Sequence, residues 1–239
     1  MSKRRVLVTG ASKGIGRAVV DRLAADGFEP IGLARSAPPD FPGQFVAVDL
    51  ADRAATAAAL DTIVAEGRVD AGRGGQQRRP GPVRPHRVGR SGRPVSHLRP
   101  ERAHRGPVVQ AVLPGMVEAR WGRIVNISSL TTTGVDERTP YAAAKGALET
   151  ATRIWADELA SSGITVNAVA PGPIETEMYR ERSRVGSARE ALVLKGIPMR
   201  RVGTPTEIAH VICMLLHDDA GYITGQIVRV DGGGSIGAS

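Results

Sequence analysis

Short apolar runs alternate with longer alanine-rich stretches along most of this chain of 239 residues. The apolar runs hold four to six residues each and lie at 6–9, 29–33, 45–48, 123–127, 164–169 and 226–230. Their continuous apolar character is typical of strands that are buried on both faces of a sheet. Helical stretches between them cover residues 15–26, 52–65, 141–160 and 205–216. This alternation predicts a single α/β domain over residues 1–239, built on a doubly wound parallel sheet.

One window departs from this pattern. Residues 72–105 contain ten arginines and one acid, Glu101, which gives a local charge of +9, whereas the remaining 22 basic and 23 acidic residues give −1. Five prolines in the window exclude a central strand and a long helix there. One strand and most of one helix are therefore missing between Asp70 and Gly106.

The overall charge of +8 would by itself suggest a nucleic-acid partner. The charge is confined to the window, which holds no aromatic residue, so only sequence-independent phosphate binding would follow from it. We do not expect nucleic acid to be the partner. A scaffold that binds nucleic acid through residues 72–105, or a catalytically impaired cofactor sensor, remains the alternative function.

The cysteine and histidine residues point to no metal site or disulfide framework. Cys213 is the single cysteine, and it lies in an apolar helical stretch where it is expected to pack as a small buried hydrophobe. His86, His97 and His104 have no cysteine partners and no ligand-like spacing. No run approaches the 18 apolar residues of a membrane span, so we expect a cytoplasmic protein that does not contact membranes.

A glycine-rich turn joins the first strand to the first helix and reads Thr9-Gly10-Ala11-Ser12-Lys13-Gly14-Ile15-Gly16. Glycines allow the backbone amides and the positive end of the helix to approach a pyrophosphate, as in dinucleotide-binding Rossmann folds. The turn can also be an ordinary connection between strand and helix that binds no ligand. In this strand-turn-helix context we assign cofactor binding to Gly10, Ser12, Lys13, Gly14, Ile15 and Gly16.

The end of the second strand distinguishes the two nicotinamide cofactors. An acid there binds the ribose hydroxyls of NAD, whereas a cation pairs with the 2′-phosphate of NADP. This chain has Arg35 at that position and no acid, and Lys13 could reach the same phosphate. The sequence favours NADP(H) over NAD(H), the alternative being that Arg35 is an ordinary solvated arginine.

Tyr141 and Lys145 stand four residues apart on a predicted helix, so both side chains emerge from one face. An ammonium group about 4 Å from a phenolate stabilises it by about 4 kcal/mol at an effective dielectric constant of about 20. The pair therefore suits a tyrosine that exchanges a proton with a substrate. The same spacing is also common on solvated helix surfaces.

Three further motifs accompany the pair: strand 122–127 ending in Ser128-Ser129, the loop Asn167 to Thr176, and the closing segment that contains Gly221 to Gln226 and Val230 to Gly233. With these motifs, residues 4–70 and 106–234 resemble the short-chain dehydrogenase/reductase family, in particular its 3-oxoacyl-acyl-carrier-protein-reductase-like members. The resemblance implies an NADPH-dependent oxidoreductase that interconverts a carbonyl and a secondary alcohol, with a small or carrier-linked substrate from fatty acid or polyketide metabolism. It also implies a homotetramer.

The resemblance assigns roles to individual residues. Tyr141 would be the general acid/base, Lys145 would make its phenol more acidic and hold the nicotinamide ribose, and Ser129, rather than Ser128, would bind the substrate carbonyl. Residues 175–200 would form a mobile substrate lid. Further cofactor contacts are implied for Asp49 and Leu50 at the adenine and for Pro171, Gly172, Ile174 and Thr176 at the nicotinamide.

In the family a buried strand ending Asn-Asn-Ala-Gly and a helix with a further catalytic asparagine occupy the place of the arginine-rich window. One hypothesis is that residues 72–105 are the right gene translated in the wrong frame. Read one base later, the codons of Gly75 to Arg79 are compatible with Val-Asn-Asn-Ala-Gly, and those of Leu98 to Arg102 with Tyr-Asp-Leu-Asn-Val. A genuine insertion is the alternative.

Overall fold

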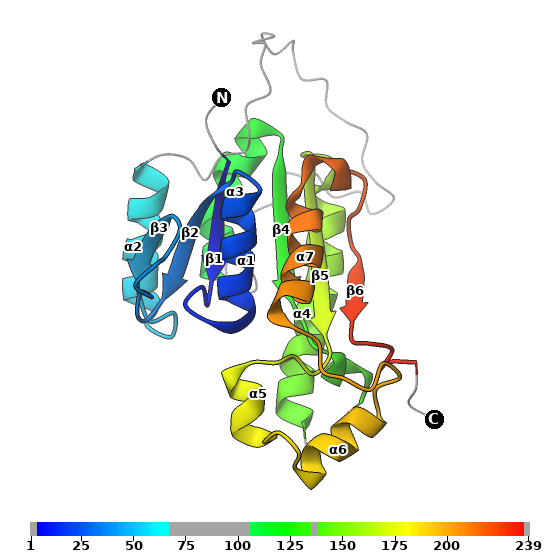
Figure 1. Cartoon of the computed structure of the whole chain (residues 1–239). Helices are drawn as coiled ribbons and strands as arrows, with labels where there is room; N and C mark the ends of the chain where they lie inside the picture. Colours follow the sequence, from blue (N-terminus) through cyan, green and yellow to red (C-terminus); the bar gives the residue numbers. More distant parts are fainter. Residues whose placement is uncertain (1–3, 67–105, 135–137, 237–239) are drawn as a thin grey trace.

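The computed structural model describes residues 4–66, 106–134 and 138–236 (Figure 1). The window 72–105, with its expected anomalous strand and helix and its three histidines, lies outside the described residues. The strands of the described chain are β1 (Arg5–Thr9), β2 (Glu29–Ala34), β3 (Gln44–Ala47), β4 (Gly122–Ile127), β5 (Ile164–Pro171) and β6 (Ile227–Val230). The helices are α1 (Gly14–Ala25), α2 (Arg53–Ala65), α3 (Pro107–Ala119), α4 (Thr139–Ala160), α5 (Glu177–Arg182), α6 (Ala188–Lys195) and α7 (Pro205–Leu216), with short 3-10 turns at Leu130–Thr133 and Asp218–Ala220.

All strand pairs of the described chain are parallel, as predicted. They form two sheets of three strands, in the orders β1-β2-β3 and β4-β5-β6. Val8 pairs with Gly32 in the first sheet, and Asn126 pairs with Ala168 in the second. The parallel strands and flanking helices confirm the predicted doubly wound α/β fold, and within the described residues no hydrogen-bonded pairing joins β1 to β4.

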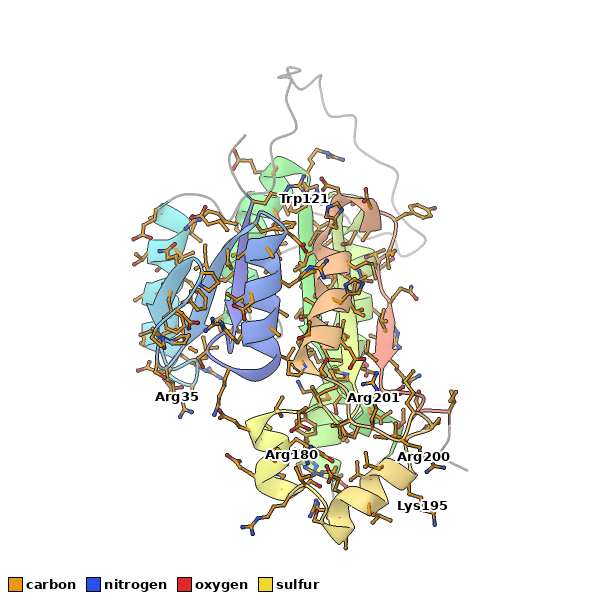
Figure 2. All side chains as sticks on the ribbon, in the orientation of Figure 1. Arg35, Trp121, Arg180, Lys195, Arg200 and Arg201 are labelled. Atoms are coloured by element: carbon orange, nitrogen blue, oxygen red, sulfur yellow. The ribbon has the colours of Figure 1, made fainter. Side chains whose placement is uncertain are left out.

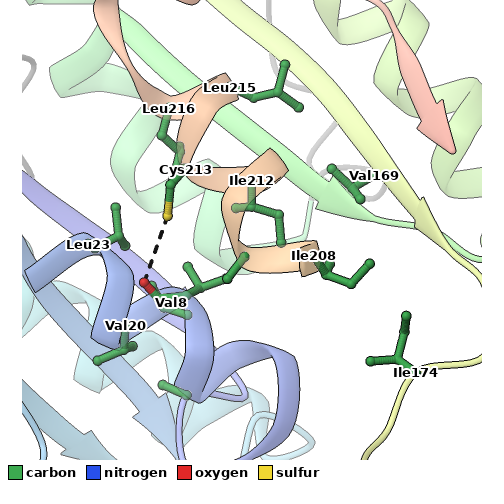
Figure 3. Close-up of a cluster of buried hydrophobic side chains, with 13 residues drawn as sticks. Val8, Val20, Leu23, Val169, Ile174, Ile208, Ile212, Cys213, Leu215 and Leu216 are labelled. Atoms are coloured by element: carbon green, nitrogen blue, oxygen red, sulfur yellow. Dashed lines mark hydrogen bonds between the residues drawn. The ribbon is translucent and has the colours of Figure 1, made fainter. Parts of the chain in front are cut away.

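Helices cover both faces of the two sheets. On one face α1 and α7 lie side by side and bury a core shared with β1 and β5, drawn in Figure 3 (Val8, Val20, Leu23, Val169, Ile208, Ile212). On the other face α3 joins two further cores, because it packs against β4 and α4 and also against β2 and α2. The helices therefore hold the two sheets together where strand pairing does not.

Local signals in the sequence set the helix ends. The Asp52 side chain accepts hydrogen bonds from the backbone amides of Ala54 and Ala55 at the start of α2, as expected of a capping residue. Thr204 and Glu207 form a reciprocal capping box at the start of α7. Cys213 in α7 is buried, which confirms its predicted packing, and burial raises the pKa of its thiol to about 12.

No helix within the described ranges is both long and apolar enough to cross a bilayer.

Candidate active site

The predicted site residues gather at the carboxyl ends of the parallel strands, where ligands bind in open α/β sheets. The glycine-rich turn follows β1, Arg35 follows β2, Ser128 and Ser129 follow β4, and the 171–176 loop follows β5. Helices α5 and α6 lie beyond this edge of the sheets (Figure 1). Figure 2 shows Arg35 and Arg180 at this end of the molecule and Trp121 at the opposite end.

The glycine-rich turn depends on the absence of side chains. Gly10 and Gly14 adopt positive φ angles of 67° and 58°, which favour glycine. A Cβ atom on Gly16 would lie 2.2 Å from the Gly10 carbonyl oxygen, so the start of α1 packs directly on the turn. The Gly10 amide donates to the Leu33 carbonyl at 2.8 Å and ties the turn to β2. This cradle fits a dinucleotide phosphate, because only a bare backbone can approach so closely.

Two cations lie beside the turn. Lys13 and Arg35 are exposed, and the positive charge of Arg35 opposes protonation of Lys13, as expected of close neighbours. Lys13 donates to Glu177 of α5 at 2.5 Å, and this bond is the main reason that the pKa of Lys13 is raised. The two cations fit a 2′-phosphate, and one of them also joins the turn to the segment predicted as a lid.

Asp49 and Leu50 follow Val48, just beyond β3, and both are exposed. The Asp49 carboxylate accepts a hydrogen bond from the Ala51 amide at 3.0 Å, which shapes the turn into α2. Their side chains are open to solvent at the same sheet edge as Arg35, so both are accessible to a ligand there.

The serine pair at the end of β4 has two different environments. The Ser128 side chain is buried and donates to the Glu149 carboxylate at 2.6 Å. Ser129 is partly exposed, and its hydroxyl oxygen accepts from the Thr131 amide at 3.2 Å. Because the hydroxyl hydrogen of Ser128 is already used, Ser129 is the serine that is open to a substrate.

Lys145 lies between the end of β4 and Tyr141. Its ammonium donates to the Ile127 carbonyl at 2.5 Å and lies 5.8 Å from the centre of the Tyr141 ring. Burial lowers the pKa of Lys145 below its ordinary value. Tyr141 itself is 48% exposed, so a substrate can reach its ring from solvent. The helix thus brings the predicted pair together.

The 171–176 loop is held by backbone bonds. The Gly172 amide donates to the Val230 carbonyl at 3.0 Å, and a Cβ atom at Gly172 would lie 2.8 Å from the Asp231 Cα atom. Pro171 and Ile174 are buried, and Thr176 caps α5 through the Tyr179 amide. The loop therefore has a fixed path from β5 to α5.

Helices α5 and α6 are joined by Arg180. Its guanidinium binds Glu175, just before α5, and donates to Glu190 of α6 at 2.5 Å. These bonds lie within the predicted lid, so residues 175–200 form a unit with its own internal ties.

Glu149 is a functional candidate that sequence reasoning missed. This acid is 9% exposed, and its carboxylate accepts from both Ser128 and Thr132, the latter at 2.9 Å. Glu149 lies one helical turn after Lys145. Helix α4 therefore binds the end of β4 through two side chains, Lys145 at the Ile127 carbonyl and Glu149 at the Ser128 hydroxyl. The sequence spacing could have indicated this role, because Glu149 is four residues after Lys145 and therefore lies on the same inward face of the helix.

One cavity connects the two parts of the site. It is lined by Gly10 and Gly16 of the glycine-rich turn and by Ile127 and Lys145 of the second half. A dinucleotide on the turn and a substrate beside Lys145 would therefore meet in a shared space. The described residues contain no cluster of His, Cys, Asp and Glu that could hold a metal ion.

Comparison with known families identifies this architecture. The model described as "short chain dehydrogenase" matches residues 4–71, and the model described as "Enoyl-(Acyl carrier protein) reductase" matches residues 107–235. A 3-oxoacyl-acyl-carrier-protein reductase from Escherichia coli is 37% identical over 248 residues, covering 95% of each chain. The chain belongs to the short-chain dehydrogenase/reductase family.

The family relatives match to different extents. The 3-oxoacyl-acyl-carrier-protein reductase of Pseudomonas aeruginosa is 52% identical over 125 residues, which cover 52% of this chain and 49% of that protein. This match therefore spans about half the length of that relative.

Solved structures of the family share the fold. YwfH, an NADPH-dependent reductase of bacilysin biosynthesis, matches with a TM-score of 0.76 and 26% identity over 98% of each chain. An actinorhodin polyketide ketoreductase solved with NADPH matches with a TM-score of 0.75 and 28% identity, over 98% of this chain and 97% of that one. None of these matches is described as a nucleic-acid-binding protein, so the alternative function gains no support.

Proposed function

We propose that this family member is an NADPH-dependent oxidoreductase that interconverts a 3-oxoacyl thioester and its secondary alcohol. The observation that carries the proposal is the shared cavity, which places the glycine-rich turn and Lys145 around one space. The relatives named as 3-oxoacyl-acyl-carrier-protein reductases support this substrate class.

The cofactor would lie along the glycine-rich turn, with its 2′-phosphate beside Lys13 and Arg35 and its nicotinamide end along the 171–176 loop. Asp49 and Leu50 would contact the adenine. NADPH, when bound, supplies the hydride for the carbonyl carbon. The cradle without side chains suits the pyrophosphate of either cofactor, and the two neighbouring cations support NADPH over NADH.

Three side chains would carry the proton chemistry. The Ser129 hydroxyl orients the substrate carbonyl, and the Tyr141 hydroxyl donates a proton to the carbonyl oxygen during reduction. Lys145 favours the tyrosinate that this step leaves behind, because its ammonium is held beside the ring by the Ile127 carbonyl. In the reverse direction the same tyrosinate removes the proton from the alcohol.

We further propose that residues 175–200 are a lid over the substrate, and that the enzyme is a cytoplasmic homotetramer. The Lys13–Glu177 bond supports the lid, because it links this segment to the cofactor turn. Exposed cations of the segment, such as Arg182, Arg184 and Arg189, suit an anionic carrier-linked substrate.

The test follows consumption of NADPH, and separately of NADH, by the natively expressed protein with a panel of 3-oxoacyl thioesters and simple ketones. We expect turnover with NADPH and a thioester, and a loss of at least about 100-fold in kcat for Tyr141→Phe. Tyr222→Phe is the matched control, because that tyrosine is fully exposed and should turn over normally. Equal turnover by Tyr141→Phe and the native protein would refute the proposal.

A further inference from the structure

Helix α5 lies beside the glycine-rich turn that joins β1 to α1 (Figure 1). The Lys13 ammonium donates to the Glu177 carboxylate at 2.5 Å, and this ion pair bridges two segments that are 164 positions apart. The Thr176 methyl group lies next to Gly14, where an added Cβ atom would be 3.4 Å from it. A side-chain bond and close packing therefore both fix the start of α5 against the turn that is proposed to hold the cofactor.

The charges on the two sides of this contact are opposite. Lys13 and Arg35 on the cofactor side are both exposed. Glu177 and Glu181 stand four residues apart in α5, so their carboxylates share one helical face. Both carboxylates favour the protonated form of Lys13, whereas the charge of Arg35 opposes it. The cation pair that fits a 2′-phosphate therefore already has acidic neighbours within the chain.

Glu177 and a 2′-phosphate would compete for the same ammonium group. If the phosphate lies beside Lys13, a carboxylate in contact with that ammonium lies next to a second negative charge, and the two anions repel each other. The side chains of Lys13 and Glu177 are 67% and 68% exposed, so both can turn away into water. An exposed ion pair of this kind contributes little to stability, and a bound phosphate can displace it.

We propose that Glu177 is a specificity-determining residue of the cofactor site, whose carboxylate occupies Lys13 until a 2′-phosphate displaces it. The inference rests on the proposed placement of that phosphate beside Lys13 and Arg35. With a dinucleotide that lacks the phosphate, the Lys13–Glu177 bond stays intact and α5 remains tied to the turn. With a dinucleotide that carries it, Lys13 changes partner and α5 is released.

Release of α5 would affect the substrate side of the cavity. Met178 is next to Glu177 in the chain, and it lines the cavity together with Lys145. The Arg180 guanidinium ties α5 to Glu190 of α6, so the two helices would respond together. The ion pair that responds to the 2′-phosphate is therefore adjacent to a wall of the proposed substrate space, and NADPH would loosen this wall whereas NADH would not.

The first test measures the Kd of NADPH and of NADH by fluorescence titration of the natively expressed protein and of its Glu177→Gln variant. The substitution removes the competing charge, so the Kd for NADPH should fall about two- to fivefold, the range expected for an exposed ion pair. The Kd for NADH should stay constant. Asp157→Asn removes an exposed charge from α4 and is the matched control, which should change neither Kd. An unchanged Kd for NADPH, or an equal fall for both cofactors, would overturn the proposal.

The second test asks whether the effect depends on Lys13. In a Lys13→Met background Glu177 has no ammonium to occupy, so Glu177→Gln should lower the Kd for NADPH less than it does in the native background. An equal decrease in both backgrounds would mean that Glu177 only repels the phosphate, which would overturn the competition for Lys13.

The third test compares amide hydrogen exchange of α5 in the saturated NADPH and NADH complexes. In the native protein we expect faster exchange over residues 177–182 with NADPH, because the bond to Lys13 is lost. In Glu177→Gln the two complexes should exchange alike. Equal exchange in the two native complexes would overturn the release of α5.

None of these readouts requires turnover. Normal reduction of a 3-oxoacyl thioester together with an unchanged Kd for NADPH in Glu177→Gln would refute this inference alone. A tighter NADPH complex of Glu177→Gln without turnover of any thioester or ketone by the native protein would refute the proposed reaction alone.

Discussion

The two halves of the site are built by different means. In the β1-β2-β3 half the site is formed by backbone atoms of the glycine-rich turn, because a side chain at Gly16 would collide with the Gly10 carbonyl oxygen. In the β4-β5-β6 half the site is made of side chains, because α4 fixes the end of β4 through Lys145 and Glu149. Binding of the cofactor and chemistry at the substrate should therefore respond to different kinds of substitution.

The largest effect is expected from Lys145→Met in the side-chain half. Turnover should fall by at least about 100-fold, while thermal stability at pH 7 should not decrease, because the buried ammonium costs free energy. The cost is full while the lysine is protonated in the folded protein, and it falls as pH rises from the lowered pKa to the ordinary value of 10.5.

The pH profile of the native enzyme tests the same group. Loss of the Lys145 proton should reduce kcat on the alkaline side, at a pH below the ordinary lysine value of 10.5. A profile of kcat that stays flat up to that pH would contradict this role for Lys145.

Next in size, Gly16→Ala should damage the backbone half. The new methyl group would lie 2.2 Å from the Gly10 carbonyl oxygen, so the turn must move. We expect the affinity for NADPH to fall by about 10- to 100-fold, measured by fluorescence titration. Gly115→Ala is the control, because nothing lies within 4 Å of its added Cβ atom. Equal NADPH affinity in both variants would show that the cradle does not hold the phosphate.

Glu149→Ala should have an intermediate effect that is confined to the chemical step. Ser128 and Thr132 lose their shared acceptor, which should reduce kcat by about 10-fold while the Kd for NADPH stays constant. Glu149→Gln keeps an acceptor oxygen and should recover most of the rate. Asp157→Ala, at an exposed position of the same helix, is the control. A parallel change in the Kd for NADPH would contradict the separation of the two halves.

The smallest effect is expected from Arg35→Ala. Because Arg35 is exposed, we expect the KM for NADPH to rise only about fivefold, with the KM for NADH unchanged. Arg53→Ala removes another exposed arginine and serves as the control. An equal rise in the KM for NADPH and for NADH would mean that Arg35 does not bind the 2′-phosphate.

Much of the fold could be predicted from the sequence because its signals are local. The buried run that became β5 (Ile164–Pro171) and the capped run that became α7 (Pro205–Leu216) lie within two residues of their predicted bounds. Lys145 and Tyr141 were predicted as a pair because helix periodicity alone brings them together. These features need no knowledge of the rest of the chain.

The remaining features depend on contacts between distant residues. Lys13 and Glu177 are 164 positions apart, and no periodic pattern predicts their bond. The acceptor for Ser128 is an acid that looks like a solvated helix residue until α4 packs on β4. The cavity that β1 and β4 line together likewise became visible only when both sheets were assembled.

The most direct test of the proposed chemistry is a crystal structure of the natively expressed protein with NADP and a 3-oxoacyl thioester analogue. The account predicts the carbonyl carbon about 3–3.5 Å from the nicotinamide C4 atom, with the Tyr141 hydroxyl in hydrogen-bond contact with the carbonyl oxygen. A Tyr141 hydroxyl that points away from the ring, or a dinucleotide bound away from the glycine-rich turn, would contradict it.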